Sequence, residues 1–479
     1  MTALWTAQAA AAATGGRASR AWTADGVSID SRSLARGDLF VALVGPNADG
    51  HDHVAAALAA GAAAAVVQRR PKGLPADAPL LEVADTFEAL NALAAAARRR
   101  AAARIVAVTG SVGKTGTKEA LRLVLGRQAP TAASLGNLNN HWGAPLSLAR
   151  MAPDAAYGVF ELGMNHPGEI APLSRLVRPH VALITTIAPA HTAFFRSLDE
   201  VADAKAEIFE GVAPDGTALL NRDNGWFDRL AEAARRRGIG RILGFGRSRD
   251  AEARVLEAEL GAEGSRVAAE IDGRRLAYRI GAPGPHWVVN SVAVLAAVAA
   301  LGADLAAAAE ALADMEAPAG RGRRCRLGPE GRSFELIDES YNASPEAMRA
   351  AFAVLQLAEP APGGRRIAVL GDMLELGDDA PALHAGLAGD LAARGVDRVY
   401  AAGPAMAALF AALPPAARGA HAPDTAALAP LVAASVQPGD VVLVKGSLGM
   451  NMARIVAALA ARGPHPEAMA ASGQQRQAG

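Results

Sequence analysis

The segment Ile105–Leu125, IVAVTGSVGKTGTKEALRLVL, is the feature of this sequence that most limits the fold. An apolar stretch typical of a buried strand runs into a glycine-containing turn and then into a helical pattern. That order directs backbone N–H groups and a helix N-terminus at one point, which is how open α/β sheets bind phosphate. We therefore predict a nucleotide-binding loop made of Thr109, Gly110, Ser111, Val112, Gly113, Lys114 and Thr115.

Within this loop, Lys114 is expected at the terminal phosphates and Thr115 at a Mg²⁺ ion. The usual phosphate-loop pattern has a glycine five residues before Gly113. This chain has Val108 at that position, and its Gly110 lies closer to Gly113 in the sequence. The alternative is a glycine turn that simply ends a strand. Because strand, loop and helix follow one another in the required order, we favour nucleotide binding.

The length of the chain predicts several domains. A chain of 479 residues exceeds what one core organises, and about 150 residues per domain suggests about three. We predict an α/β fold with a small N-terminal α/β domain (1–84), a central doubly wound ATP-binding domain (85–316) and a C-terminal Rossmann-like open α/β domain (317–463). The tail 464–479 is expected to be disordered, and the alternating polar passage 253–280 to add antiparallel strands.

Composition excludes several classes of protein. Hydrophobic residues make up 51% of the chain, and 48 basic residues balance 48 acidic ones, so neither a disordered tail nor a basic nucleic-acid binder is expected. The single cysteine, Cys325, rules out an intramolecular disulfide framework and fits a reducing compartment. With no signal-peptide pattern and no long apolar run, we expect a cytoplasmic protein without a membrane span.

Lysine is rare in this chain: the 48 basic residues include five lysines, at positions 72, 114, 118, 205 and 445. Lys205 lies in VADAKAEIF, where Val201, Ile208 and Phe209 share its helix face, so an amine stands where an apolar side chain is expected. Desolvation would lower its pKa and leave neutral amine that can react with carbon dioxide to form a carbamate. The alternative is a lysine whose stem is buried while its amine reaches water.

Two further residues follow predicted strands and so lie at the sheet edge where open α/β proteins bind ligands. Glu161 ends the strand in GVFELGMNHPGEI, and its carboxylate suits Mg²⁺. His191 follows the strand in VALITTIAPAH and could approach the same edge. The alternatives are a solvent-facing carboxylate and a structural histidine.

Taken together, these motifs resemble the Mur ligase family from Asp30 to about Ala460. The sequence TGSVGKT is similar to the family's ATP loop, and GNLNN, ELGMNHPGEI, DESYNASPEAM, GDMLELG and VKGS extend the likeness. The resemblance implies an ATP-dependent ligase that works through an acyl phosphate. Its expected substrates are UDP-N-acetylmuramoyl-tripeptide and D-Ala-D-Ala, its expected cofactor is Mg²⁺, and its expected form is a monomer.

The resemblance also implies roles for individual residues. It assigns catalysis to Lys114, Lys205, His191 and Arg321, and metal binding to Thr115, Glu161, His191 and a carbamylated Lys205. On the nucleotide side it implies an adenine contact for Asn290, a hinge arginine reaching ATP at Arg321, and further nucleotide positions at Asp338 and Asn342. The implied positions on the UDP-linked substrate are Ser31, Arg32, Asn137, Asn139 and Asn140.

Two departures from the family pattern lie near these positions. His286-Trp287 stands where the family has His-Asn, and Asp338-Glu339 where it has Asp-Asp. The loops around Asp372 and Lys445 are candidates for the dipeptide contact. Alternatives are the diaminopimelate-adding sibling, whose Asp-Asn-Pro-Arg motif is absent here, a folylpolyglutamate-type ligase, and a nucleotide-binding module without ligase activity.

Overall fold

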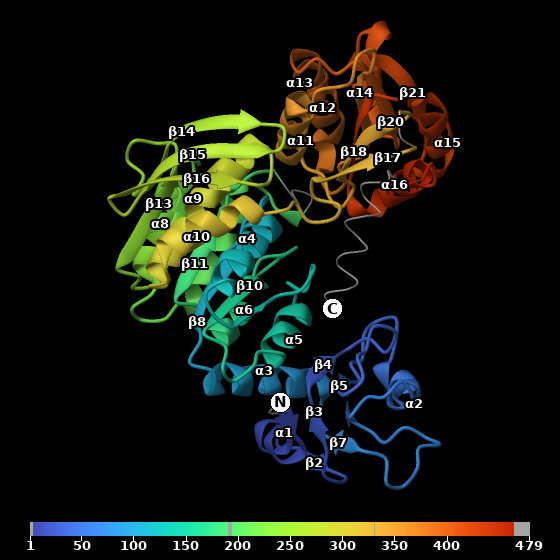
Figure 1. The fold of residues 1–479 in the computed structure, drawn as a ribbon. Coiled ribbons are helices and arrows are strands. Elements are labelled where there is room, and N and C mark those ends of the chain that lie inside the picture. The colour runs from blue at the N-terminus through green and yellow to red at the C-terminus, as the bar shows by residue number, and fades with distance from the viewer. Residues whose placement is uncertain (1–2, 190–193, 330, 464–479) are drawn as a thin grey trace.

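A computed structural model of the chain describes residues 3–189, 194–329 and 331–463. His191 and the predicted disordered tail 464–479 lie outside these residues. The described chain forms three α/β domains that follow one another in sequence, as Figure 1 shows by colour. The predicted fold class, with three α/β domains, is therefore confirmed.

The N-terminal domain is built on a small sheet ordered β2-β7-β6-β5-β4, in which β4 to β7 run parallel. Its buried strands carry short apolar runs, such as the LFV of β5, that fill a core on each face. The elements are β1 (Trp5–Thr6), α1 (Ala7–Thr14), β2 (Arg17–Ala18), β3 (Thr23–Ala24), β4 (Gly26–Ser28), β5 (Asp38–Val41), α2 (Val54–Ala59), β6 (Ala64–Val67) and β7 (Leu80–Glu82).

The central domain contains the largest sheet, ordered β16-β15-β14-β13-β12-β11-β8-β10-β9. Strands β8 to β14 pair in parallel, and β14, β15 and β16 are antiparallel, which confirms the added strands predicted for residues 253–280. Its strands are β8 (Arg104–Thr109), β9 (Thr131–Ala133), β10 (Tyr157–Glu161), β11 (Val181–Ile184), β12 (Thr217–Asn221), β13 (Arg241–Gly246), β14 (Ala253–Gly261), β15 (Gly264–Ile271) and β16 (Arg274–Ile280).

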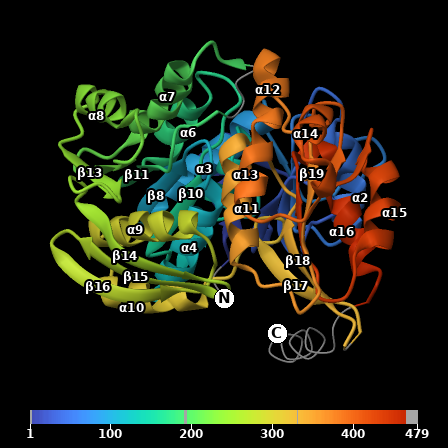
Figure 2. The same ribbon diagram turned by 90° about the horizontal axis from the view of Figure 1, so that it is seen from above.

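Helices cover both faces of this sheet, as a doubly wound fold requires. One face packs on α4 (Lys114–Gly126), α9 (Pro285–Ala300) and α10 (Leu305–Ala311). The other packs on α3 (Thr86–Arg100), α5 (Gly143–Ala149), α6 (Ile170–Val177), α7 (Leu198–Ala206) and α8 (Phe227–Arg236), and Figure 2 shows the layers from above.

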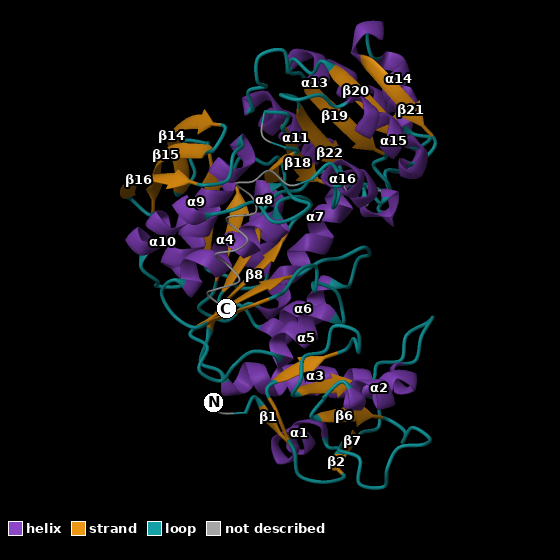
Figure 3. Cartoon of the chain, turned by 45° about the vertical axis from the view of Figure 1, so that its right-hand side comes forward, coloured by secondary structure: helices purple, strands orange, loops and turns teal. Residues whose placement is uncertain are grey.

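The C-terminal domain has a second open sheet, ordered β17-β18-β22-β19-β20-β21, parallel except at β17. Helix α11 lies on the side that meets the central domain and contacts α9 (Figures 1 and 3). The elements are β17 (Arg323–Leu327), β18 (Phe334–Glu339), α11 (Pro345–Leu357), β19 (Arg366–Gly371), α12 (Ala380–Ala385), α13 (Leu387–Ala393), β20 (Arg398–Ala402), α14 (Met406–Ala412), β21 (Arg418–Ala422), α15 (Thr425–Ser435), β22 (Val441–Lys445) and α16 (Ala453–Ala460).

Helix α3 joins the first two domains. Its residues Leu90, Leu93 and Ala97 belong to the apolar core that also contains Trp5 and Val27 of the N-terminal domain. The indole Nε1 of Trp5 donates to the Ala149 carbonyl at 2.9 Å. The predicted boundary at residue 84 falls between β7 and α3, and the two domains share a continuous core beyond it. No helix in the described parts of the chain is both long and apolar enough to cross a membrane.

Candidate active site

The predicted nucleotide loop links β8, which ends at Thr109, to α4, which begins at Lys114. Gly110 has φ +144° and Gly113 has φ +88°, conformations that favour glycine. A Cβ atom at Gly110 would lie 1.9 Å from the Thr185 hydroxyl, so the backbone can pass there only without a side chain. Val108 lies within β8, and Gly110 and Gly113 form the turn that follows it.

The segment that follows β11 (Val181–Ile184) holds this loop from the side. The Thr185 hydroxyl donates to the Val112 carbonyl at 2.6 Å, and the Ser111 N–H donates to the Thr186 carbonyl at 2.8 Å. The Ser111 hydroxyl in turn accepts from the Ala188 N–H at 3.1 Å. The loop is therefore fixed before any ligand arrives, which lowers the entropy cost of binding.

Lys114 folds back over the loop. Its Nζ donates to the Gly110 carbonyl at 2.5 Å and lies 3.3 Å from the Ser111 carbonyl. Burial lowers the pKa of Lys114; the nearby Glu161 carboxylate opposes that shift, and the Arg321 guanidinium adds to it. Thr115, the next residue of α4, is buried. Glu161 and Arg321 therefore each lie within electrostatic reach of Lys114, although the three residues come from separate segments.

Glu161 has the features of a cation ligand. It is the last residue of β10, its side chain is 1% exposed, and its Oε1 accepts from the Asn139 amide at 2.7 Å. Its Oε2 is buried and has no hydrogen-bond partner among the described residues. A buried carboxylate oxygen left free is costly unless a cation or donor satisfies it, so Glu161 fits Mg²⁺.

The described residues contain no group of three or more His, Cys, Asp and Glu side chains that could hold a metal. The remaining oxygens around a metal at Glu161 would have to come from other groups, such as the Thr115 hydroxyl, a phosphate or a modified lysine. His191, the other predicted metal residue, lies outside the described part of the chain.

Lys205 is buried on α7, whose N-terminus Ser197 caps by accepting from the Glu200 N–H at 3.3 Å. Burial lowers the pKa of Lys205 well below its ordinary value, and the positive charge of Lys114 lowers it further. Within the described residues its Nζ has no hydrogen bond or ion pair. The structure thus places the Lys205 side chain inside the protein and near Lys114. The alternative, a lysine whose stem is buried while its amine reaches water, would leave the amine in solvent.

The first turns of α4 meet helix α9. The Asn290 amide nitrogen lies 3.1 Å from where a Cβ on Gly113 would be. One turn earlier, the buried indole of Trp287 lies over Gly116. Asn290 is therefore beside the nucleotide loop, and Trp287, which stands where the family has Asn, packs on the first turn of α4.

Arg321 lies in the turn between the central and C-terminal domains, with its guanidinium 4.1 Å from the centre of the Tyr341 ring. The Asp338 carboxylate accepts from the Gly320 N–H at 3.2 Å and the Ser340 N–H at 3.1 Å. Asp338, expected at the nucleotide, here holds the turn that carries Arg321. Asn342 is exposed and accepts from the Ala343 N–H at 2.8 Å.

The three predicted substrate asparagines have different surroundings. Asn137 is exposed, and Asn140 uses its side-chain oxygen to accept from the Gly143 N–H at 2.9 Å, which caps α5. Asn139 instead binds Glu161. The loop therefore joins the candidate metal residue to a surface facing solvent.

Ser31 and Arg32 lie after β4 in the N-terminal domain, in a different domain from the loop. Arg32 is 87% exposed on its side chain, and its Nη2 donates to Asp30 at 2.7 Å. That bond to Arg32 lowers the pKa of Asp30 to about 2. The Arg32 guanidinium is therefore exposed and is held in one orientation by Asp30.

The loops suggested for the dipeptide make internal contacts. Asp372 is buried and accepts from the Met406 N–H at 2.8 Å, capping α14. Lys445 is buried, and its Nζ donates to Glu339 and to the Asn342 carbonyl, each at 2.9 Å. Glu339, which stands where the family has Asp, is thus the partner of Lys445.

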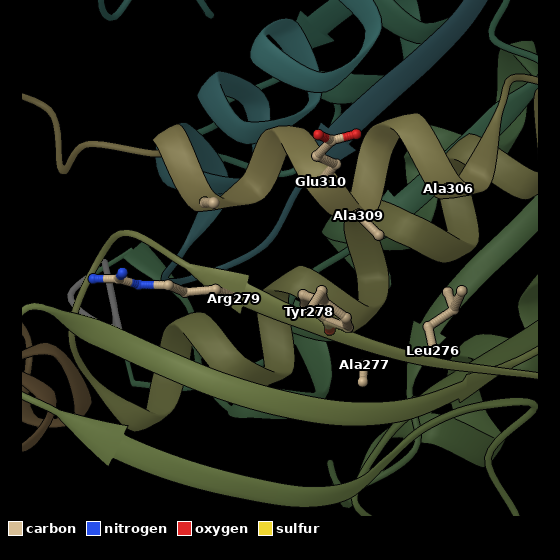
Figure 4. A pocket seen from close by; sticks show the side chains of 8 residues that line it. Leu276, Ala277, Tyr278, Arg279, Ala306, Ala309 and Glu310 are labelled. Carbon is tan, nitrogen blue, oxygen red and sulfur yellow. The ribbon is translucent and has the colours of Figure 1, made fainter.

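Sequence reasoning assigned no role to Thr185, Lys118 or Ser134, which support the loop and Glu161. The scarcity of lysine was the available signal for Lys118, and Thr185 carried none. A separate shallow pocket of about 390 Å³ lies between β16 and α10. Figure 4 shows that its Arg279 and Glu310 do not converge on a common point, so it provides no set of polar groups for a ligand.

Three family models match this chain in succession. The Mur ligase family catalytic domain matches residues 23–98, the Mur ligase middle domain residues 108–298, and the Mur ligase glutamate ligase domain residues 322–448. Together they reach across the three domains described above.

Individual proteins match over nearly the full length. The chain is 33% identical to the UDP-N-acetylmuramoyl-tripeptide–D-alanyl-D-alanine ligase of Rickettsia prowazekii, covering 95% of this chain and 99% of that protein. The crystal structure of MurF from Acinetobacter baumannii matches with a TM-score of 0.81 at 32% identity, over 95% of this chain and 98% of that one. MurF ligase from Thermotoga maritima in complex with ADP matches with a TM-score of 0.74 at 26% identity, over 91% and 97%. The chain belongs to the Mur ligase family.

Proposed function

We propose that this chain is an ATP-dependent ligase that joins D-Ala-D-Ala to UDP-N-acetylmuramoyl-tripeptide. The observation that carries the proposal is the free Oε2 of buried Glu161, within electrostatic reach of Lys114 at the nucleotide loop. The substrates are taken from the name of the Rickettsia relative. Its match to 95% of this chain supports the same substrate assignment for this protein. The ADP complex of the Thermotoga relative supports the nucleotide.

The chemistry requires activation, because a carboxylate oxygen is a poor leaving group. An oxygen of the tripeptide carboxylate attacks the γ-phosphorus of ATP, the bond to the bridging oxygen breaks, and ADP and an acyl phosphate result. The neutral amine of D-Ala-D-Ala then attacks the acyl carbon, loses a proton and expels inorganic phosphate. Phosphoryl transfer depends mainly on positioning and charge stabilisation, which Lys114, the loop amides and Arg321 would supply.

Thr115, Glu161 and a carbamylated Lys205 are the proposed Mg²⁺ residues, together with His191. Bound Mg²⁺ would neutralise phosphate charge during transfer. The carbamate forms when the neutral Lys205 amine bonds to the carbon of carbon dioxide and releases a proton. Low pKa and burial favour that reaction, since they keep the amine unprotonated.

The remaining residues are proposed as substrate positions. Asn290 would meet the adenine, Asn342 the nucleotide side, and Ser31 and Arg32 the uridine end. Asn137 and Asn140 would face the tripeptide arm, while Asn139 would orient Glu161. Asp338 would act through the hinge turn that it holds rather than by contacting the nucleotide.

Arg321 is proposed to complete the site when the C-terminal domain closes on ATP. Closure would also keep water from the acyl phosphate. Because Lys114, Glu161, Lys205 and Arg321 come from one chain, we propose that a monomer suffices, acting in the cytoplasm where ATP is available.

The test is phosphate release from ATP and Mg²⁺ with UDP-N-acetylmuramoyl-tripeptide, with and without D-Ala-D-Ala, while the nucleotide product is followed by mass. We expect release that needs both substrates and a product heavier by one dipeptide less water. Release that responds instead to another amino acid would overturn the substrate assignment, and ATP binding without release would overturn the ligase assignment.

A further inference from the structure

Lys118 is a charged residue in the interior that the proposed chemistry does not use. It lies one turn after Lys114 on α4, and its side chain is 0% exposed. Its Nζ donates to the Ser134 carbonyl at 2.9 Å, lies 3.4 Å from the Gly136 carbonyl, and pairs with the carboxylate of Glu119. A buried ammonium is tolerated only when its donors are satisfied, and these acceptors satisfy it.

Two of those acceptors belong to the segment 134–140, which forms hydrogen bonds to Glu161 at two places. The Ser134 hydroxyl accepts from the Glu161 N–H at 3.3 Å. Further along, the Asn139 amide donates to the Glu161 carboxylate at 2.7 Å, and the Asn139 carbonyl accepts from the Gly163 N–H at 2.8 Å. The segment therefore holds both the backbone and the side chain of Glu161 by hydrogen bonds.

This segment fits closely against the end of β10. A Cβ atom at Gly163 would lie 2.7 Å from the Asn139 side-chain oxygen, so the loop has little freedom to shift towards the strand. On its other side the anchor is the Lys118 ammonium. A compact ammonium can aim its donors at three separate acceptors, whereas the planar guanidinium of arginine, the common cation of this chain, presents its donors in one plane.

We propose that Lys118 is a positioning residue: it fixes segment 134–140 to α4 and thereby sets the Glu161 carboxylate at the distance from Lys114 that a shared phosphate and cation require. The inference rests on the proposed function, in which Glu161 holds Mg²⁺. Residues that orient metal ligands commonly contribute about 10–100-fold to metal affinity.

The test compares Lys118→Met and Lys118→Arg with the control Arg122→Met. Arg122 lies one turn further along α4, pairs with the same Glu119 and is 52% exposed on its side chain, so its removal tests the helix and the ion pair without the interior contacts. The readouts are Tm, hydrogen exchange of residues 134–140 and 161–163, and binding of Mn²⁺ in the presence of ADP by electron paramagnetic resonance.

For both Lys118 variants we expect exchange in 134–140 to quicken and Mn²⁺ affinity to fall about tenfold, while ADP affinity changes less than about threefold. In turnover, the Mg²⁺ concentration for half-activity should rise more than the KM for ATP. Lys118→Met with wild-type exchange and wild-type Mn²⁺ affinity would overturn the proposal, as would an equal loss of ADP and Mn²⁺ affinity.

If Lys118→Met does not fold, Ser134→Ala tests the same link, because it removes the hydroxyl that holds the Glu161 N–H and leaves the Ser134 carbonyl for Lys118. Reduced Mn²⁺ affinity in Ser134→Ala supports the proposal, and unchanged affinity contradicts it. Exchange and Mn²⁺ binding need no turnover, so a wild-type protein that binds Mn²⁺ but ligates no dipeptide would overturn the proposed function alone.

Discussion

The indole ring of Trp287 occupies the space that a side chain at Gly116 would need, since a Cβ on Gly116 would lie 2.5 Å from Cη2 of the ring. Trp287 is 5% exposed and so has little room to move. Glycine within a helix is less favourable than alanine by about 1 kcal/mol, so its presence here indicates a packing requirement. The bulky residue at 287 and the absent side chain at 116 form one complementary pair.

We expect Gly116→Ala to lower the free energy of unfolding by about 1–3 kcal/mol through overpacking, and to weaken ATP binding because Gly116 follows Thr115. In a Trp287→Asn background the same substitution should instead stabilise, since the steric conflict is gone and helix propensity remains. Denaturant unfolding and ATP titration of the four proteins measure this. Gly126→Ala on the same helix is the control, because no atom lies within 4 Å of its added Cβ.

Replacement of Lys205 should abolish most ligase activity if its carbamate holds metal. We expect Lys205→Ala to lose activity by about 100-fold or more and to recover part of it with added short carboxylic acids, which supply the missing oxygens. Phosphate release with and without formate or acetate checks this, with exposed Lys72→Ala as the control. Full activity in Lys205→Ala without any added acid would contradict the metal role.

Lys205 should also make stability depend on pH. Its folded-state pKa is lowered below the ordinary value of 10.5, so the unfolded chain binds more protons between the two values and stability rises with pH there. In carbon dioxide-free buffer we expect Lys205→Met to have the higher Tm at pH 7, with the difference shrinking as pH approaches 10.5. A Tm difference that stays constant over this range would show that burial of the amine is not the cause.

Glu161→Gln keeps the size of the side chain and its bond from Asn139 but removes the charge. We expect the Mg²⁺ requirement for half-activity to rise about 10–100-fold, with Tm unchanged or higher because a buried negative charge is lost. Mg²⁺ titration of phosphate release measures the effect. Glu169→Gln serves as the control, because Glu169 is an exposed carboxylate in the segment between β10 and α6.

Arg321→Ala should lower kcat by about 100–1000-fold while changing the KM for ATP much less, because the guanidinium is proposed to act on charge that develops during transfer. It should also raise the pKa of Lys114, since Arg321 contributes to lowering it. Steady-state kinetics with exposed Arg332→Ala as a control tests the first claim. Unchanged turnover in Arg321→Ala would remove the basis for domain closure onto ATP.

Local patterns were enough to predict several structural features around this candidate site. The glycine turn, the end of the strand at Glu161 and the serine cap before Lys205 each depend on a few consecutive residues. The choice of partners across the fold could not be predicted in this way. Asp338 binds the Gly320 N–H, and Lys118 reaches Ser134, because tertiary packing brings those groups within bonding distance. The apolar helix face around Lys205 indicated a buried amine, and no pattern in the sequence indicated which groups Lys118 would contact.

The apolar core that α3 shares between the first two domains has a consequence for catalysis. To swing away from the central domain, the N-terminal domain would have to expose Leu90, Leu93 and Ala97 to water, and the Trp5 indole would lose its bond to the Ala149 carbonyl. At the other junction, the turn around Gly320 and Gly322 is a short backbone connection with both residues at positive φ. The first junction is therefore held by buried apolar packing, whereas the second is a short turn that contains two glycines. We expect the proposed closure on ATP to move the C-terminal domain and to leave the N-terminal domain in place.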